Sequence, residues 1–257
     1  MAAQNGCHAD RGLPGLAELP DLTPFTAVST EIPRLLISHF LDLGATFLFS
    51  LTGAMVAIRR HYDWVGLFVL ALCSGIGGGL LRDGIFLQEG PPAAMRSPEY
   101  LWAVIAGCVA ASLFHQRAGK LEKPFLYVDA LGLGAYGVVG MSKALAAGLS
   151  APAAIFVGVV NAVGGSVIRD VLVRSEPLLF KPGQFYVLAS LIGVCAHSSL
   201  ERWAQLPPAA ADGCAVGVTF LIRVLSIRFN WKTGPILPEP ALPPDKLSNP
   251  DDSPYDH

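Results

Sequence analysis

Charged residues occur inside long apolar stretches of this 257-residue chain. On insertion scales, each such charge costs at least ~2.5 kcal/mol at the centre of a membrane helix, so these side chains should face the protein interior. Charges kept at that cost indicate a function rather than an accident of sequence. The set comprises Asp42, Arg82, Asp83, Asp129, Lys143, Arg169 and Asp170.

The depth of these charges predicts two buried ion pairs. Asp42 lies near the start of one apolar stretch, and Arg82 lies near the end of the next, which returns to the same side of the membrane. We therefore expect an Asp42–Arg82 pair in one half of the membrane. The internal repeat described below predicts an Asp129–Arg169 pair in the other half. The alternative is that these pairs only hold the helices in register.

Three further charges have no predicted partner. Asp83 and Asp170 directly follow their arginines, so each points about 100° away around a helix. Arg223 lies in the last apolar stretch and has no counterpart in the repeat.

A stripe of residues on the fourth apolar stretch is a candidate ion path. Its spacing of 3, 4, 4 and 3 residues places all members on one helical face. Small residues would leave room for a narrow aqueous path, and a lysine about 21 Å from the aspartate at the other end is a natural gate. The alternative is a lysine that snorkels to the outer interface. The stripe comprises Asp129, Gly132, Tyr136, Gly140 and Lys143.

Glycine runs lie at equivalent places in the second and fifth apolar stretches. Each glycine costs about 1 kcal/mol relative to alanine inside a helix, so three together favour a kink or a break. A broken helix exposes backbone groups that must face protein or a water-filled cavity. The alternative is tight helix packing without a kink. The expected kinks comprise Gly77, Gly78 and Gly79, and Gly164, Gly165 and Ser166.

The elements that position these residues are membrane helices. The chain is 52% hydrophobic and only 15% charged, and its mean hydropathy is +0.49. Because a bilayer core needs roughly 20 mostly apolar residues per helix, the sequence predicts an all-α polytopic membrane protein. Seven spans are expected, over about 35–58, 64–87, 100–116, 125–147, 152–173, 184–203 and 212–229.

The flanking charges predict how the spans face. Nine Lys and Arg residues flank them on one side and three on the other. Because Lys and Arg are enriched on the cytoplasmic side, the excess places the N-terminus outside and the C-terminus in the cytoplasm. We expect the protein in the inner membrane of the cell. The terminal segments 1–33 and 231–257 are rich in proline and acidic residues, and we expect both to be disordered.

The chain contains an internal repeat at an offset of 87 residues. Seven identities occur in the 42 positions from 42 to 83, and most are glycines and in-membrane charges. Because each copy holds three spans, the second copy must enter the membrane inverted, as in transporter-type architectures. We expect a first three-helix repeat over 34–118, an inverted second repeat over 124–204, and a seventh helix over 211–230.

Other functional classes are disfavoured. A net charge of −2 gives no general attraction to nucleic acid. The five cysteines form no CxxC, which argues against a disulfide framework or a zinc site. A GxGxxG sequence at 132–137 follows no strand, so the dinucleotide interpretation fails. We expect no enzyme activity, no metal site and no resident cofactor.

The motifs together resemble a known family. Paired glycine-rich and Arg-Asp motifs at one repeat distance, aspartates near the start of spans one and four, and Gly140 with Lys143 resemble the prokaryotic trimeric intracellular cation (TRIC) channels. This group is also described as a glycine transporter domain. The resemblance covers about 35–230, and Ser166 departs from it by replacing the third glycine of the second run.

The resemblance implies a homotrimer in membrane lipid, with a separate pore in each subunit. It further implies K⁺ as the permeant ion, pore-lining helices two and five kinked at their glycines, and a gating role for Lys143. A bound lipid is compatible with it. The alternative is a secondary transporter of glycine or another small amino acid, since inverted repeats serve both classes. A scaffold without flux is disfavoured, because buried charges are costly without a function.

Overall fold

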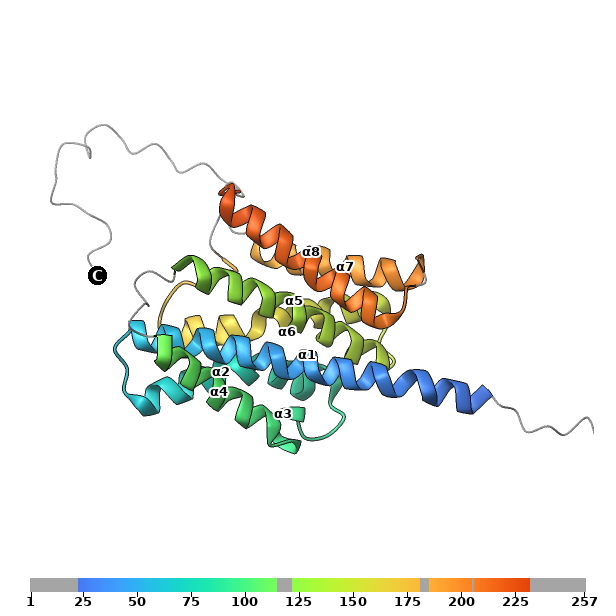
Figure 1. Cartoon of the computed structure of the whole chain (residues 1–257), viewed down its shortest axis with the longest axis horizontal. Coiled ribbons are helices and arrows are strands. Elements are labelled where there is room, and N and C mark those ends of the chain that lie inside the picture. Colours follow the sequence, from blue (N-terminus) through green and yellow to red (C-terminus); the bar gives the residue numbers. More distant parts are fainter. Residues whose placement is uncertain (1–22, 115–121, 181–184, 205, 232–257) are drawn as a thin grey trace, which may run out of the picture.

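The protein is helical throughout the part that the computed structural model describes, residues 23–114, 122–180, 185–204 and 206–231 (Figure 1). These residues form eight α-helices and one short π-helix. The expected all-α class is therefore confirmed for them. The elements are α1 (Thr23–Arg59), α2 (Trp64–Leu81), η1 (Arg82–Leu87, the π-helix), α3 (Ala93–Arg96), α4 (Glu99–Phe114), α5 (Glu122–Ala146), α6 (Ala151–Leu172), α7 (Tyr186–Arg202) and α8 (Pro208–Arg228).

Five described segments are long and apolar enough to cross a membrane. They coincide with the expected first, second, fourth, fifth and seventh spans. The second runs from α2 into η1. The helices α4 and α7, at the third and sixth expected spans, are shorter, so the count of seven stays a prediction. The five segments are Leu36–Arg59, Trp64–Leu87, Phe125–Ala146, Ala151–Leu172 and Pro208–Arg228.

The first helix begins earlier than expected. It starts at Thr23 and runs to Arg59, and its first turns extend beyond the other helices in Figure 1. The expectation of disorder is therefore wrong for residues 23–33. Pro24 falls in the first turn, where a helix tolerates proline because its first N–H groups have no intrahelical acceptor. Residues 1–22 and 232–257 lie outside the described residues.

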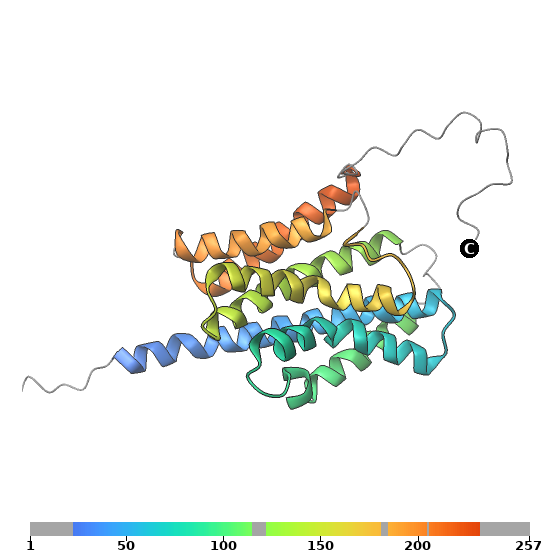
Figure 2. The same cartoon turned by 180° about the vertical axis from the view of Figure 1, so that it is seen from behind.

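The helices α1 and α5 pack against each other at the centre of the bundle. α2 and α4 pack on α1, whereas α6, α7 and α8 pack on α5, as the two opposite views show (Figures 1 and 2). α2 and α6 also pack against each other. The four helices α1, α2, α5 and α6 therefore enclose the middle of the protein.

Glycines allow α2 and α6 to cross with their backbones in contact. A Cβ atom added at Gly78 would overlap the carbonyl oxygen of Asn161, and one added at Gly165 would overlap the carbonyl oxygen of Ser74. The two contacts become equivalent after a shift of 87 residues. Ser74 lies against Gly165, and Gly78, one turn later on α2, lies against Asn161, one turn earlier on α6. The two helices therefore run antiparallel.

Neither glycine run breaks its helix. α2 continues through Gly77, Gly78 and Gly79 to Leu81, and α6 continues through its own run to Leu172. The expected break does not occur, because close packing between the two helices offsets the poor helix propensity of glycine. A bend of the helix axis stays a prediction. The irregular backbone begins after the first run, where η1 winds as a π-helix.

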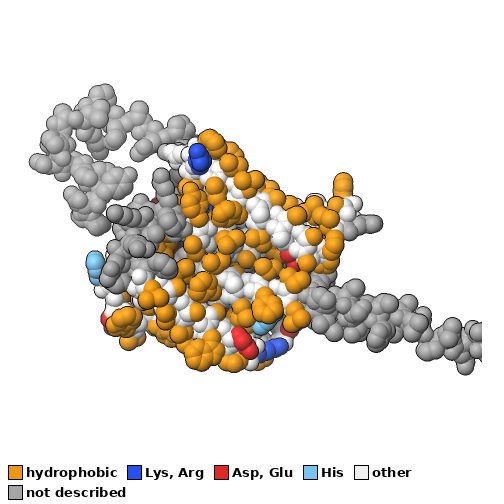
Figure 3. All heavy atoms as spheres, in the orientation of Figure 1, with side chains coloured by type: hydrophobic (Ala, Val, Ile, Leu, Met, Phe, Trp, Pro, Cys, Tyr) orange, Lys and Arg blue, Asp and Glu red, His pale blue; other side chains and the backbone are white. Residues whose placement is uncertain are grey.

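The distribution of side chains is that of a protein in lipid. Figure 3 shows apolar side chains over most of the visible face and few charges among them. Leu113 is 75% exposed, whereas Arg82 and Arg169 are each 1% exposed. Soluble proteins show the reverse pattern, since arginine is almost never fully buried there unless it is paired. The chain is a multi-pass membrane protein.

Candidate functional site

A first charge cluster surrounds Asp42 on α1. Arg82 places its two terminal nitrogens 3.3 Å and 3.4 Å from the two carboxylate oxygens, which confirms the first predicted ion pair. Tyr100 of α4 donates its hydroxyl to Oδ2 at 2.8 Å, and Lys143 of α5 places Nζ 2.6 Å from the same oxygen. Following the expected orientation, we name Asp42, Arg82, Asp83, Tyr100 and Lys143 the outer cluster.

Asp83 has a partner, contrary to the expectation from sequence. Arg82 Nε donates to Asp83 Oδ1 at 2.6 Å, and Asp83 Oδ2 accepts the N–H of Ala93 at 2.9 Å. Consecutive Cβ atoms do diverge on a helix, but the arginine side chain is long enough to bring one edge of its guanidinium back to the next residue. Nη2 also donates to Asp83 Oδ2 at 3.1 Å, while both terminal nitrogens contact Asp42, so one guanidinium holds two carboxylates.

Lys143 lies between the buried carboxylate and an open cavity. Its side chain is 28% exposed, and it borders a cavity of about 330 Å³ that His39, Asp83 and Tyr100 also line. The lysine therefore does not simply snorkel to the interface, because its amine is held by the fully buried Asp42.

A second charge cluster surrounds Asp129 on α5. Arg169 of α6 places Nη1 3.3 Å from Asp129 Oδ1, which confirms the second predicted ion pair. The same nitrogen donates to the hydroxyl of Thr52 on α1 at 3.1 Å. Arg169 Nε donates to Asp170 Oδ1 at 2.9 Å, so Asp170 also has a partner, for the same reason as Asp83. We name Thr52, Asp129, Arg169 and Asp170 the inner cluster.

One face of α1 joins the two clusters. Asp42, Thr46, Phe49 and Thr52 are 4, 3 and 3 residues apart, which keeps them on one side of the helix. About 15 Å along the axis separates the first from the last. Midway, Thr46 shares a hydrogen bond with the Tyr136 hydroxyl at 2.8 Å, and the Phe49 ring stacks on Tyr136 with 5.3 Å between centroids. All five side chains are buried.

The stripe on α5 is buried except for the partly exposed Lys143, and its small residues leave no open path in this structure. Tyr136 donates its hydroxyl to the backbone carbonyl of Gly75 on α2. A Cβ atom at Gly132 would lie 3.0 Å from the Phe49 ring, and one at Gly140 would lie within 3.0 Å of α6. The small residues therefore allow neighbouring groups to pack closely against α5 instead of leaving space. The open aqueous path expected from the sequence is not present in this structure.

Three residues of the site were not expected from sequence: Thr46, Thr52 and Tyr100. None carries a charge, and each stands alone in an apolar stretch, so no compositional signal marks it. Helical spacing from Asp42 could have identified the two threonines. Tyr100 belongs to another helix, and only the packing of α4 on α1 places it beside the aspartate.

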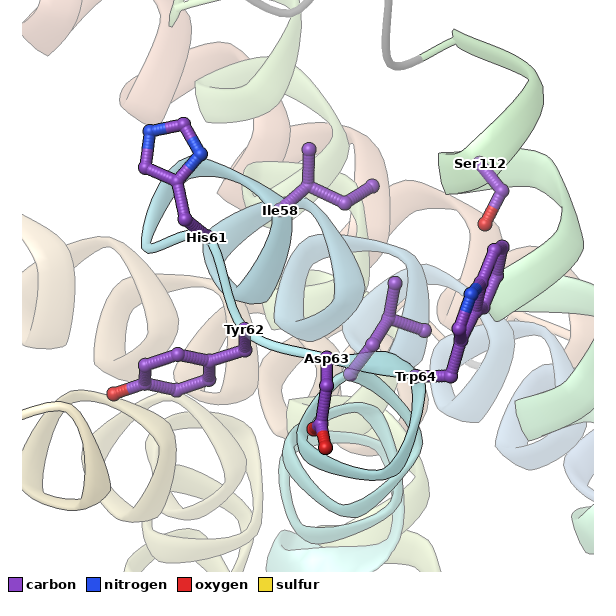
Figure 4. Close-up of a pocket in the computed structure, with 7 residues that line it drawn as sticks. Ile58, His61, Tyr62, Asp63, Trp64 and Ser112 are labelled. Carbon is purple, nitrogen blue, oxygen red and sulfur yellow. The ribbon is translucent and has the colours of Figure 1, made fainter.

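A second cavity, of about 430 Å³, lies away from both clusters at the turn between α1 and α2. In Figure 4, Trp64 and Ser112 lie on one side of this turn and Tyr62 on the other. Asp63 caps α2 there by accepting the N–H of Gly66 at 2.7 Å. None of the buried charges lines this cavity, so we assign it no part in the site.

The buried clusters consist of ion pairs rather than metal ligands. Among the residues that the structure describes, no group of three or more His, Cys, Asp or Glu side chains could bind a metal ion. Each central carboxylate instead faces arginine, hydroxyl or lysine donors inside an apolar bundle. Fold and site together define a polytopic helical membrane protein with an ionic interior.

Comparisons with known proteins identify the family. The family model described as Glycine transporter matches residues 39–116 and again residues 126–202. The chain is 32% identical to a UPF0126 membrane protein of Deinococcus radiodurans, over 78% of this chain and 93% of that protein. It is 30% identical to the UPF0126 inner membrane protein YadS of Escherichia coli, over 77% and 95%. The chain belongs to the family described as Glycine transporter.

Solved structures of TRIC channels share the fold. A TRIC orthologue from Rhodobacter sphaeroides superposes with a TM-score of 0.67 at 30% identity, covering 75% of this chain and 98% of that one. A second TRIC cation channel superposes with a TM-score of 0.69 at 28% identity, covering 79% and 98%. The resemblance to the TRIC family is confirmed, and its members of known structure are channels rather than enzymes.

Proposed function

We propose that this protein is a passive channel for monovalent cations, K⁺ in particular, with one pore in each subunit. The observation that carries the proposal is the buried face of α1, which runs from the outer cluster to the inner cluster. Its carboxylate and hydroxyl oxygens offer ligands that can replace part of the water around a cation. The similarity to solved TRIC cation channels supports the same function.

The outer cluster supports a preference for cations and a gating role for Lys143. It sets two carboxylates, Asp42 and Asp83, against two cations, Arg82 and Lys143, and is neutral while the lysine is bound. When Lys143 leaves Asp42, one negative charge beside the cavity loses its partner. A permeant cation can then take the place of the ammonium group. In this account, the bound lysine closes the outer end and the aromatic stack closes the middle.

The proposed architecture is a pair of inverted three-helix repeats plus α8, with seven spans. The reciprocal contacts of α2 and α6 support it, because antiparallel partners are related by an axis perpendicular to the helices, in the membrane plane. The two matches of the family model also begin 87 residues apart, at 39 and 126. α2 and α6 would line the pore, with bends at their glycine runs.

The proposed assembly is a homotrimer in the inner membrane, with the N-terminus outside and the C-terminus in the cytoplasm. The Rhodobacter sphaeroides relative is described as a trimeric channel, and the Escherichia coli relative as an inner membrane protein. The excess of Lys and Arg on one side supports the orientation.

A secondary transporter of glycine or another small amino acid is the second candidate. The reciprocal packing of α2 against α6 favours it, since inverted repeats provide the two halves of many carriers. The family description as Glycine transporter points the same way.

Flux measurements in liposomes test the choice between the two. Purified protein is reconstituted with K⁺ inside, and K⁺ efflux and uptake of radiolabelled glycine are followed in parallel. We expect K⁺ efflux down its gradient that scales with protein content, without accumulation of glycine. Glycine uptake driven by a Na⁺ or H⁺ gradient, without K⁺ efflux, would overturn the channel proposal.

A further inference from the structure

Arg223 on α8 is a buried cation without a hydrogen-bonded partner. Its side chain is 0% exposed, and none of its three guanidinium nitrogens has a hydrogen-bond partner among the described residues. Its guanidinium carbon lies over the ring of Tyr186 on α7, 4.8 Å from the ring centroid. A buried charge in this state is costly, so its position needs an explanation.

The inner cluster holds a matching free acceptor. Asp129 Oδ2 is buried and has no hydrogen-bond partner among the described residues, since Arg169 uses only Oδ1. No hydrogen bond joins Asp129 Oδ2 to the Arg223 guanidinium in this structure.

Helix packing places Arg223 and Asp129 at the same depth. Gly134 of α5 contacts Val216 and Thr219 of α8. From this contact Asp129 lies about 7.5 Å along α5, and Arg223 lies about 6 Å beyond Thr219 along α8. Both steps lead in the same direction, because α5 and α8 run antiparallel in the bundle.

The inner cluster with Arg223 then has the same composition as the outer cluster. Each has two aspartates, one arginine from its repeat, a nearby tyrosine, and a second cation that the repeat does not supply. In the outer cluster that cation, Lys143, contacts its aspartate at 2.6 Å. In the inner cluster the second cation is Arg223, and it makes no hydrogen bond to Asp129.

We propose that Arg223 is the gating cation of the inner end, which closes the path by binding Asp129 Oδ2 as Lys143 binds Asp42. This inference rests on the proposed channel function. In this structure Lys143 is bound to Asp42, whereas Arg223 is not bound to Asp129. The position on α8, outside the repeats, lets a shift of α8 against α5 open or close the inner end.

Single-channel recording of Arg223 variants tests the inference. R223Q keeps much of the length and loses the charge, so the ratio of open to closed times should rise about tenfold, within the usual range for a coupling between sites. R223K keeps the charge and should gate much like the parent. R228Q, which removes an exposed arginine from the same helix, is the matched control and should leave gating unchanged.

The thermal unfolding of the same variants separates gating from structure. Because Arg223 donates no hydrogen bond in this structure, R223Q should not lower the melting temperature. A lower melting temperature with unchanged gating, or gating identical to that of R228Q, would overturn the inference while leaving the channel proposal intact. A parent protein without unitary currents would instead overturn the channel proposal, and the inference with it.

Discussion

At the scale of single residues, each repeat arginine serves two carboxylates, and this arrangement explains how charge is held in an apolar bundle. Arg82 lies between Asp42 and Asp83, and Arg169 holds the equivalent pair. One guanidinium with two carboxylates is a net negative unit, so a second cation is needed to neutralise it. The members of each cluster should therefore depend strongly on one another.

Removing Arg169 should destabilise the protein. Arg169→Ala leaves Asp129 and Asp170 without their shared cation, and such a loss typically costs about 3–5 kcal/mol. Adding Asp129→Ala should recover part of that loss, because one of the stranded charges is then removed. The free energy of unfolding in detergent measures both effects. Arg60→Ala, at an exposed arginine, should change it little. Losses that simply add would mean that Arg169 and Asp129 do not interact.

Substitution of Lys143 should alter gating. Lys143→Ala removes both the bond to Asp42 and the bulk beside the cavity, so we expect greater K⁺ flux and a weaker dependence on voltage. Moving one charge across the full membrane field is worth about 2.3 kcal/mol per 100 mV, so even partial movement of the lysine makes opening voltage-dependent. Lys143→Arg should keep much of the gating, and Lys143→Gln separates charge from length. If all three variants conduct and gate like the parent, Lys143 is not the gate.

At the scale of the elements, the crossing of α2 and α6 sets the geometry of the whole site. Arg82, at the start of η1 directly after α2, and Arg169 of α6 each lie a short distance beyond a glycine run, so the crossing fixes both arginines relative to α1 and α5. Backbone contact at Gly78 and Gly165 leaves no space for a side chain on either helix. The glycines are thus required for close approach as well as for any bend.

Alanine substitutions at different positions of the two glycine runs should have opposite effects on stability. Gly78→Ala and Gly165→Ala place a methyl group against a backbone carbonyl, which cannot move aside, so each should cost roughly 1–3 kcal/mol. Gly79→Ala is the matched control, because its new Cβ atom meets only Arg82 at 3.6 Å, an ordinary contact. The gain in helix propensity, about 1 kcal/mol, should make that variant neutral or more stable. Equal melting temperatures for the three variants would contradict close packing as the role of these glycines.

Much of this arrangement was predictable, because charges and glycines in apolar sequence carry a strong signal. The depth of Asp42 and Arg82 in the membrane, carried to Asp129 and Arg169 by the repeat, predicted both pairs that the structure contains. The partners of Asp83 and Asp170 were not predictable from helical angles, since they depend on the reach of a flexible arginine. The open path expected along α5 is absent in this structure because the Phe49 ring of α1 packs against Gly132. The sequence of α5 alone does not show which residues of α1 will face it.

At the scale of the whole molecule, the outer and inner clusters lie at opposite ends of one buried surface, with an aromatic stack between them. The repeats supply the arginines and aspartates of both clusters, whereas Lys143 and Arg223 lie outside the duplicated pattern. A path with closures at two ends and in the middle suits a gated channel whose conformations differ by small helix shifts. The apolar face in Figure 3 suits contact with lipid or with the other subunits of the proposed homotrimer.

Recording from the purified protein in a planar bilayer tests the channel claim most directly. With K⁺ on both sides and a voltage applied, we expect discrete current steps of picoampere size. Such a step carries more ions per second than any carrier can transport. One pore per subunit of a homotrimer further predicts up to three equally spaced levels in one active complex. A protein that yields no unitary steps, while it moves a small amino acid across the same bilayer lipids in liposomes, would contradict the account.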